Sequence, residues 1–524
     1  MKLLPYLLVS LLFATACSTS SETAENIPFE ISNLSGPEKL KKALELDYIL
    51  SMGLSELDQQ YLRSFYSGQQ FKPLWMNDSM LTVMGTKMAD LLQTPEKLGI
   101  PSGRNQRTKG QNFVQAELLN TLYLSRIVYD LKVGTIDLEK KVKRPVLSVP
   151  VKELNQFTHF DEQTDLREQF LAFGPNDSTY QVLGKGLIAM YDNYPMDSTK
   201  FHVETIKKDT LKAISETTKA LISKGYLTIE NDSLALMEAL KVFQMHNGLK
   251  PDGVIGKYTA MALNESTVHK RDRVILGMEK LRAHAPYPEK RICINIPEYM
   301  LRFYIGDSLK SEHHIVAGKY ENQTPELTSK LNKIVAYPYW NVPYSISSKE
   351  ILPAVKQNSG YLQKHNYKIY KKGELVDPAT VDWSKIRENN FPYKVVQDPG
   401  KSNSLGIIKF DFPNAHSVYF HDTPSKSLFS ADVRAYSHGC MRTQNPVDLA
   451  RKIIERNQLP MKENELIVDS LDSIMAREKN YTIRLLDPIP IFVEYQTVTR
   501  KANDMVIHID IYGRDEEYLK IMRN

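Results

Sequence analysis

The stretch RICINIPEYMLRFYIGDSLKSEHHIVAG, residues 291–318, is where the patterning of the chain changes from helix to strand. Apolar and polar residues alternate along it with a period of two, which is typical of half-buried strands. Gly306 and Asp307 separate two such runs and predict a hairpin turn. Further short runs of this kind follow in NKIVAYPYW, LGIIKFDF, SVYFHD, NYTIRLLD, IFVEYQTV and DMVIHIDIY. Many short strands with few helices predict a β-sandwich-like domain.

A polar, Tyr-rich segment between about residues 349 and 401 interrupts this series of strands. Long insertions are uncommon in compact domains, and they often act as lids or as elements that shape a substrate groove. Because the segment comes shortly before the run SVYFHD, residues 417–422, we predict that it caps a groove on the strand domain.

The residues before the strand domain carry helical patterning. Between about residues 30 and 205, KMADLLQTPEKLGI and AELLNTLYLSRIVYDLKVGTID repeat apolar residues at spacings of three and four. No cluster of catalytic residue types occurs there, so we interpret this half as a mostly helical scaffold. The stretch HKRDRVILGMEKLRAH, residues 269–284, predicts a long helix that returns to the scaffold.

Residues 206–266 have a tighter helical pattern than the scaffold. TLKAISETTKALISKGYL and LALMEALKVFQMHNGL predict two amphipathic helices. Pro251, Asp252 and Gly253 predict a turn, and Lys257 begins another helix. The helix ALKVFQ, the loop GLKPDGVIG and the helix TAMALN resemble a three-helix peptidoglycan-binding domain. An unrelated small helical module is the alternative.

Length and composition describe a globular, multidomain protein. A chain of 524 residues predicts two to four domains, and 42% hydrophobic with 25% charged residues is a globular mixture. The net charge is +5, and no run of Lys and Arg concentrates it, so composition gives no support for nucleic-acid binding.

The first seventeen residues, MKLLPYLLVSLLFATAC, have the order of a secretory signal. Lys2 comes before an apolar run, small residues follow at Ala14 and Ala16, and then comes Cys17. This order resembles a bacterial lipoprotein signal, although Ala14 occupies a position where Leu is usual. A lipid on Cys17 would anchor the chain at the periplasmic side of a cell-envelope membrane without a spanning helix. The alternatives are an ordinary signal cut near Ala16 or a short anchor helix.

The chain contains three cysteines, and the sequence around each one differs. If Cys17 carries lipid, Cys293 and Cys440 are left in an oxidising compartment. Cys293 lies in the alternating run RICINIP, so we predict a packed thiol in a strand. Cys440 lies in AYSHGCMRTQNP, residues 435–446, whose polar approach is unusual for a core thiol. We therefore predict a functional free thiol at Cys440, with a structural cysteine and a disulfide to Cys293 as alternatives.

The residues around Cys440 suit nucleophilic catalysis. A thiol attacks as its thiolate, and lowering its pKa by about two units needs roughly 3 kcal/mol, which a neighbouring imidazolium can supply. We predict that His421 accepts the thiol proton and returns it to a leaving amine. His438, two residues before Cys440, is less well placed for this role. Gly439 allows a tight turn in which its amide and that of Cys440 point at an oxyanion.

A zinc site is the competing interpretation of the same residues. His421, His438 and Cys440 could act as three ligands, with Asp422 as a fourth. The spacing includes no C-x-x-C, no H-x-x-x-H and no other compact ligand pair, so we expect no metal and no other cofactor.

The stretch HDTPSKSLFSADVRAYSHGCMR, residues 421–442, resembles the signature of the L,D-transpeptidases with a YkuD-type catalytic domain. The large YcbB-like class of that family is the best fit, because its short motifs occur here in order. They are Thr324-Pro325, YWNVP at 339–343, EILP at 350–353, GYL at 360–362, VDW at 381–383 and NSLG at 403–406. The resemblance extends from about Arg291 to Tyr512, and more loosely over the helical regions.

The resemblance implies a substrate and a reaction. Cys440 would attack the carbonyl that joins the third residue of a peptidoglycan tetrapeptide stem to the fourth residue, D-Ala. D-Ala would leave with a proton from His421, and a thioester would remain. An amine of a second stem would then attack and form a 3→3 cross-link. The partners implied are stem peptides, glycan and the membrane.

The resemblance also implies roles for other residues. Tyr419 corresponds to a tyrosine near the oxyanion pocket, with a strand-core aromatic as the alternative. Arg442 would hold the active-site loop or bind a substrate carboxylate. Trp340 and Asn341 would line the substrate groove, although Trp340 also suits a core. His438 departs from the Ser that is usual in the large class. A backbone carbonyl often completes the triad, so Asp422 is not required as an acid.

These interpretations combine into a multidomain α+β chain. The predicted parts are a signal peptide (1–16), a lipidated tether (17–29), a helical scaffold (30–205), a peptidoglycan-binding-like module (206–266), a return helix (267–287) and a catalytic domain (288–515) with its insertion. Two other functions stay open on sequence alone. An L,D-carboxypeptidase would transfer the same thioester to water, and a non-catalytic cell-wall binding protein would rely on residues 209–264.

Overall fold

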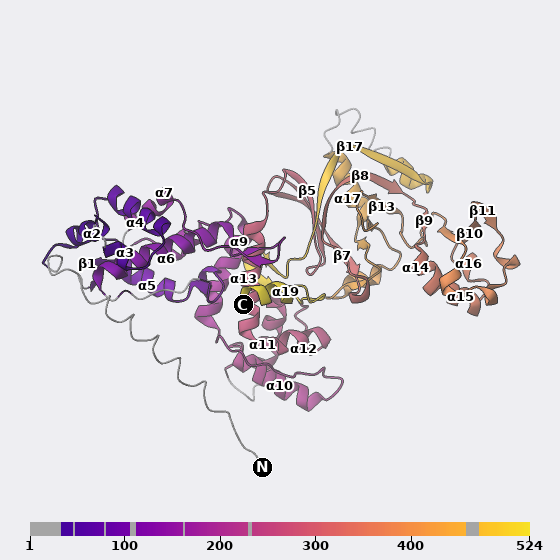
Figure 1. Ribbon diagram of the computed structural model, residues 1–524. Coiled ribbons are helices and arrows are strands. Elements are labelled where there is room, and N and C mark those ends of the chain that lie inside the picture. The colour runs from indigo at the N-terminus through magenta and orange to yellow at the C-terminus, as the bar shows by residue number, and fades with distance from the viewer. Residues whose placement is uncertain are drawn as a thin grey trace, which may run out of the picture. The chain divides into compact units, whose positions relative to one another are not determined.

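The computed structural model describes residues 33–45, 48–77, 80–104, 110, 112–160, 163–228, 233–456 and 471–523 (Figure 1). The predicted signal peptide and Cys17 lie outside the described residues. The chain divides into two compact units, which we describe separately. The first contains the described parts of residues 1–193, 271–284 and 516–524, and the second contains residues 194–270 and 285–515. None of the described helices is both long enough and apolar enough to cross a bilayer.

The first unit is mainly helical, as the sequence predicts. Its longest helix, α6 (Phe113–Val133), begins at Asn112, whose side chain accepts a hydrogen bond from the Gln115 amide. Most faces of α6 are buried, which is typical of a central core helix. The other elements of the unit are α2 (Gly36–Glu45), α3 (Tyr48–Ser51), α4 (Glu56–Gly68), β1 (Met76–Asn77), β2 (Met80–Leu81), α5 (Val83–Gln93), η1 (Pro95–Leu98), β3 (Ile136–Asp137), β4 (Val142–Lys143), α7 (Val151–Leu154), η2 (Asn155–His159), α8 (Leu166–Leu171), α9 (Ser178–Asn193) and most of α13 (Thr267–Ala283) and α19 (Asp515–Arg523).

The second unit begins with a module of three helices. They are α10 (Thr210–Ser223), α11 (Ser233–His246) and α12 (Lys257–Asn264), in the positions that the sequence predicts. The turn between α11 and α12 has Gly253 at a φ of +72° and is held by Gln244, whose amide donates to Asp252 at 3.1 Å. The module has an apolar core of its own, with Leu221, Leu240, Phe243 and Leu263 among its buried residues.

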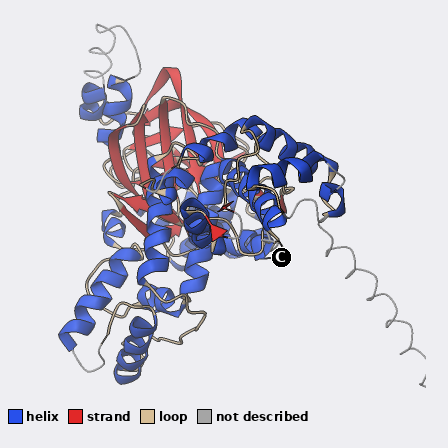
Figure 2. Ribbon diagram, turned by 90° about the vertical axis from the view of Figure 1, so that its left-hand side faces the viewer, coloured by secondary structure: helices blue, strands red, loops and turns tan. Residues whose placement is uncertain are grey.

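Residues 285–515 form a closed, mixed, eight-stranded barrel (Figure 2). The ring runs β7-β16-β14-β13-β8-β17-β5-β6 and returns to β7, and β15 also pairs with β7. The strands are β5 (Lys290–Asn295), β6 (Met300–Ile305), β7 (Ser308–Gly318), β8 (Leu327–Ala336), β13 (Ile408–Asp411), β14 (Phe420–His421), β15 (Ala435–Ser437), β16 (Met441–Thr443) and β17 (Tyr481–Glu494). The predicted hairpin turn at Gly306 and Asp307 joins β6 to β7. The predicted sandwich is wrong, because the sheet closes on itself.

The long strand β7 closes the ring. Most of its length pairs with β6, and its residues 315 and 316 pair with β16. Irregular registers in β6 and β17 add the local bend and twist that closure requires. In β17 the irregularity lies between Arg484 and Ile489, close to two prolines at 488 and 490. The two strands that the sequence predicts there are therefore one bent strand.

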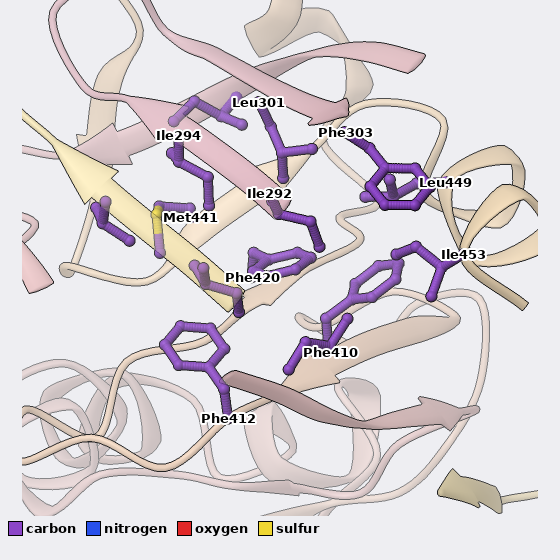
Figure 3. Packing of buried hydrophobic residues seen from close by; sticks show 14 of the residues in the cluster. Ile292, Ile294, Leu301, Phe303, Phe410, Phe412, Phe420, Met441, Leu449 and Ile453 are labelled. Carbon is purple, nitrogen blue, oxygen red and sulfur yellow. The ribbon is translucent and has the colours of Figure 1, made fainter. Parts of the chain in front are cut away.

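Large apolar side chains fill the barrel (Figure 3). Phe410 and Phe420 stack with their ring centroids 4.6 Å apart. The helix α17 (Pro446–Glu455) adds Leu449 and Ile453, which lie close to Phe303 and Phe410 in Figure 3. Fully burying a side chain of this size contributes about 1.5–3 kcal/mol. The strands that position the site therefore rest on a tightly packed interior.

The segment between β8 and β13 forms a small subdomain. Its sheet has the order β11-β10-β12-β9, and it includes β9, which precedes residue 349. Helical turns cover an apolar core that contains Ile369, Trp383 and Val395. The elements are β9 (Trp340–Asn341), α14 (Tyr344–Ile346), the π-helix η4 (Ser347–Ile351), α15 (Leu352–Gln357), α16 (Tyr361–Lys364), β10 (Tyr367–Lys371), β11 (Glu374–Val376), η5 (Pro378–Thr380), η6 (Trp383–Lys385), η7 (Glu388–Asn390) and β12 (Lys394–Gln397) (Figure 1). We call residues 340–397 the insertion.

Short elements complete the second unit. They are η3 (Tyr320–Asn322), η8 (Lys426–Ser430), β18 (Val498–Lys501) and β19 (Asp504–Ile507). The last two strands pair as a hairpin apart from the barrel ring.

Candidate active site

Two adjacent parallel strands, β14 and β16, carry the predicted catalytic residues. Phe420 pairs with Met441, and both side chains enter the barrel core (Figure 3). Side chains alternate along a strand, so the residues on either side of these two lie on the opposite face. That face carries Tyr419 and His421 from one chain segment and Cys440 and Arg442 from the other.

The turn before Cys440 is fixed by polar side chains. Gly439 has a φ of +109°, which glycine adopts without strain. The Thr324 hydroxyl donates to the Gly439 carbonyl at 2.9 Å, and the Ser437 hydroxyl donates to the Cys440 carbonyl at 2.5 Å. Both hydroxyl-bearing residues are buried, so they hold the nucleophile segment against β7.

One of the two amides predicted to bind an oxyanion is already occupied. The Gly439 N–H donates to the Ser437 hydroxyl at 3.2 Å. The Cys440 N–H has no hydrogen-bond partner in the part of the chain that the structure describes. Of these two amides, that of Cys440 is therefore the one left without a partner among the described residues, while Gly439 supplies the backbone geometry of the turn.

His421 is buried and oriented by the backbone. Its Nδ1 lies 2.5 Å from the Asp422 carbonyl oxygen, and its side chain is 5% exposed. A carbonyl only accepts, so we assign the ring proton to Nδ1, which leaves Nε2 as the basic nitrogen. Burial, reinforced by the nearby charges of Arg442 and Lys409, lowers the pKa of His421 to about 3. The imidazole is therefore neutral at neutral pH.

The Asp422 carboxylate has a structural role in this geometry. It accepts a hydrogen bond from the Ile407 amide at 3.0 Å and pairs with Lys426. Gly406, at a φ of +60°, lies beneath it, and a Cβ there would come within 2.3 Å of a carboxylate oxygen. Asp422 thus ties the NSLG segment to β14 and holds the carbonyl that orients His421.

The Cys440 thiol is half-buried, and burial raises its pKa. Hydrogen bonds from the backbone and hydroxyl of Tyr419, together with the charge of Lys409, oppose part of that increase. The thiol and the imidazole on this face of the two strands are therefore both neutral at neutral pH. Burial thus opposes a resting thiolate–imidazolium pair in this structure.

Tyr419 connects the thiol to the insertion. Its hydroxyl hydrogen-bonds with Cys440 and with Trp340, and burial raises its pKa well above the ordinary value. Its ring lies edge-on to His421 at 5.6 Å, and the Lys409 ammonium lies 4.1 Å from the ring centroid. Tyr419 therefore contacts both members of the predicted catalytic pair.

Two further predicted residues point to different roles. His438 hydrogen-bonds through Nε2 to Glu350 Oε1 at 2.6 Å, on the insertion. Arg442 is half-buried, which lowers its pKa, and no carboxylate pairs with it among the described residues. Within the same residues, no three His, Cys, Asp or Glu side chains gather in a way that could hold a metal ion. The zinc arrangement of His421, His438, Cys440 and Asp422 is not formed.

Cys293 and Asn341 lie in strands. Cys293 is a free thiol in β5, as predicted, and burial raises its pKa to about 12. Asn341 belongs to β9 and pairs with Val396 of β12, and its side chain is exposed. The structure assigns no polar contact to the Asn341 side chain within its described residues.

Sequence reasoning missed several residues that shape the site. Thr324 and Gly406 lie in motifs that resemble the large transpeptidase class, but the motifs gave no role for either. Ser437 directly precedes His438, and its bond to the Cys440 carbonyl follows from the tight turn that Gly439 predicts. Nothing in the sequence indicated a role for Glu350 at the site, apart from its place in the motif EILP.

Three protein-family models match parts of this chain. Residues 289–460 match the model of the YkuD family, described as "L,D-transpeptidase catalytic domain". Residues 289–460 belong to the L,D-transpeptidase catalytic domain family. Residues 60–187 match a "Scaffold domain", and residues 212–263 match a "Putative peptidoglycan binding domain". The L,D-transpeptidase domain thus follows a scaffold and a peptidoglycan-binding domain, which implies a place of action in the cell envelope.

The chain also shows similarity to one curated protein and to solved structures. A Haemophilus influenzae protein described as "Putative L,D-transpeptidase" is 33% identical over 246 residues, which span 47% of this chain and 48% of the relative, about half of its length. An L,D-transpeptidase structure from Stackebrandtia nassauensis is 13% identical, with a TM-score of 0.19, over 57% of this chain and 96% of that one. One from Xylanimonas cellulosilytica is 12% identical, with a TM-score of 0.16, over 58% and 98%.

Proposed function

We propose that the protein is a cysteine L,D-transpeptidase that forms 3→3 cross-links between peptidoglycan stem peptides. The observation that carries the proposal is the shared face of β14 and β16. On that face lie the thiol-bearing Cys440 and, on the adjacent strand, the neutral, carbonyl-oriented imidazole of His421. A general base that is uncharged at neutral pH can accept the thiol proton as attack begins.

The first half-reaction uses this pair. His421 Nε2 takes the proton of Cys440, and the sulfur attacks the carbonyl between the third residue of a tetrapeptide stem and its D-Ala. The Cys440 amide stabilises the oxyanion of the tetrahedral intermediate. The intermediate collapses as the C–N bond breaks, and the imidazolium returns the proton to the D-Ala amine. A thioester remains on Cys440.

The second half-reaction regenerates the enzyme. An amine on the third residue of another stem attacks the thioester carbonyl, and His421 removes a proton from that amine. The C–S bond breaks, the sulfur leaves as thiolate, and His421 returns the proton to Cys440. The products are one 3→3 cross-link and one D-Ala, so atoms and charges balance without a cofactor.

The resting protonation states set the energetic demand of the first step. Moving a proton from Cys440 to His421 is unfavourable, since burial raises one pKa and lowers the other. Tyr419 and Lys409 stabilise the thiolate as it forms. The charge pair therefore forms only while the substrate carbonyl is under attack, which keeps the resting thiol unreactive.

Other parts of the chain support a wall-bound substrate. Arg442, without a carboxylate partner among the described residues, lies on the same face as Cys440 and suits a carboxylate of the stem. The Trp340 side chain interacts with the Tyr419 hydroxyl, so Trp340 and its neighbour Asn341 suit a substrate groove beside that face. Residues 212–263 would hold the glycan or peptide polymer near the site. We further propose that lipid on Cys17 anchors the protein to an envelope membrane.

The test uses the chain from Ser18 onward with purified disaccharide-tetrapeptide, read by mass spectrometry of the products. A dimer lighter than two monomers by one D-Ala is expected, and Cys440→Ala should form none. Tripeptide as the main product would replace the proposal with an L,D-carboxypeptidase. Substrate binding without any turnover would favour a cell-wall binding protein.

A further inference from the structure

The insertion is attached to the barrel through the two chain segments at its root. Asn403, just after the insertion, donates to the Pro338 carbonyl at 3.2 Å and to the Asp398 carbonyl at 2.9 Å. It thereby ties the entering and leaving segments together. The Gln397 side chain also accepts from the Ser404 amide at 2.9 Å. These contacts fix the root and leave the rest of the insertion, with its own core, as one body.

Two polar contacts reach from this body to the residues that surround the thiol. Glu350 Oε1 bonds to His438 Nε2 at 2.6 Å, and the Trp340 side chain hydrogen-bonds to the Tyr419 hydroxyl. Among the described residues, the other hydrogen bonds and ion pairs from the insertion to the rest of the chain go to residues 398–404. Glu350 is thus the residue through which the insertion makes a polar contact with the turn before Cys440.

The local backbone around each partner suits a positioning role. Glu350 lies in a π-helix, a rare and strained form that often occurs at functional sites. The Ser348 hydroxyl in the same turn is buried and has no hydrogen-bond partner among the described residues. His438 is followed by Gly439 at a φ of +109° and then by Cys440, so a pull on the imidazole acts directly on the peptide that carries the free Cys440 amide.

We infer that Glu350 and His438 form a latch that positions the nucleophile by docking the insertion onto the turn before Cys440. With the latch closed, the turn is held on one side by Glu350 and on the other by Thr324. The Trp340–Tyr419 contact orients the donor to the thiol at the same time. With the latch open, the insertion moves about its root and admits a stem peptide. This inference rests on the proposed function and assigns His438 and Glu350 as positioning residues.

The latch predicts coupled effects on the rate of thioester formation. Both side chains are partly exposed, at 35% for His438 and 52% for Glu350, so replacing either should leave the fold intact. A solvent-exposed polar side-chain pair of this kind changes an equilibrium by at most about fivefold. We expect Glu350→Ala and His438→Ala each to slow single-turnover acylation by about two- to fivefold. The double variant should be no slower than either single variant, because both break one contact.

A rescue variant separates positioning from a loss of packing. His438→Lys supplies a hydrogen-bond donor that can reach Glu350. Compared with His438→Ala, it should restore most of the acylation rate when Glu350 is present and none in the Glu350→Ala background. The control is Glu374→Ala, on the exposed strand β11, which should acylate at the wild-type rate. Hydrogen exchange should rise at residues 344–352 and 435–440 in Glu350→Ala and stay unchanged in the barrel strands other than β15.

The decisive experiment is the acylation series with disaccharide-tetrapeptide, followed by intact-protein mass spectrometry. Non-additive losses in the two alanine variants, with rescue by His438→Lys only when Glu350 is present, support the latch. Wild-type rates in both alanine variants, or fully additive losses, overturn it. A wild-type enzyme that forms no thioester contradicts the proposed function instead, so the two failures are distinguishable.

Discussion

Cys293 and Cys440 are two thiols of the same barrel with contrasting surroundings. Both are partly buried, and burial raises the pKa of each. Cys293 lies within the regular ladder of β5, between Arg302 and Phe492 on the neighbouring strands. Cys440 lies at a turn and interacts with the Tyr419 hydroxyl, and the adjacent strand also carries the neutral imidazole of His421 on the same face. The two thiols do not differ in burial class, so a difference in their reactivity must come from the residues around each one.

The largest expected effect is the contrast between the two cysteines themselves. Cys440→Ala should lower turnover of disaccharide-tetrapeptide by at least about 10³-fold, because the nucleophile is lost. Cys293→Ala should stay within about twofold of the wild-type kcat and lose about 1 kcal/mol of unfolding free energy through lost packing. Steady-state kinetics measure the change in turnover, and thermal unfolding measures the change in unfolding free energy. Equal losses of activity in the two variants would contradict a catalytic role that Cys440 has and Cys293 lacks.

The next largest effect concerns the imidazole. His421→Ala should slow acylation by about 10²- to 10⁴-fold, the usual range for a general base. Because the pKa of His421 is lowered to about 3, its neutral, basic form persists throughout the physiological range. The control is His416→Ala, an exposed histidine in the loop before β14, which should acylate at the wild-type rate. A wild-type rate in His421→Ala would remove the base from the mechanism.

The same electrostatics predict an absence of thiolate at rest. The ultraviolet absorbance of the Cys440 thiolate, measured as wild type minus Cys440→Ala, should be absent at neutral pH and appear only in alkaline solution, since burial raises the thiol pKa. A thiolate signal between about pH 6 and 7 that disappears in His421→Ala would contradict the neutral pair and favour a preformed ion pair.

A smaller effect is expected at the tyrosine. Tyr419→Phe removes the hydroxyl that hydrogen-bonds with Cys440 and Trp340, and one such bond is worth about 0.5–1.5 kcal/mol. Acylation should therefore slow by about three- to tenfold with little change in KM. Tyr370→Phe, on the insertion strand β10, is the matched control. A change confined to KM would indicate that Tyr419 binds substrate and does not assist the thiol.

The smallest effect on chemistry, but a clear one on stability, is expected at Gly406. Gly406→Ala strains a φ of +60° and places a Cβ against the Asp422 carboxylate, so it should cost about 2–3 kcal/mol. Gly513→Ala has similar strain, at a φ of +70°, but meets no atom within 4 Å, so it should cost about 1 kcal/mol. Thermal unfolding gives the difference, and equal costs would remove the clash from the account.

The sequence predicted those elements of the fold that depend on residues close together along the chain. The three helices at residues 210–264 follow from their apolar spacing and the turn at Gly253, and the β6–β7 hairpin follows from Gly306 and Asp307. The family resemblance led to Cys440 and His421, and the structure brings both to one face.

What the sequence could not provide depends on distant contacts. Barrel closure requires β7 to pair with both β6 and β16, which alternation along a strand does not encode. Thr324 lies 115 residues from Gly439, and Glu350 lies 88 residues from His438, so neither partner is visible locally. The neutral state of the catalytic pair also arises from burial, which depends on the whole fold.

The most direct test of the central claim is intact-protein mass spectrometry of the enzyme during reaction with disaccharide-tetrapeptide. The account predicts an adduct with the mass of the donor without its D-Ala, located on Cys440 by peptide mapping and absent in Cys440→Ala. An adduct on another residue, or D-Ala release that persists in Cys440→Ala, would contradict the assignment of Cys440 as the nucleophile.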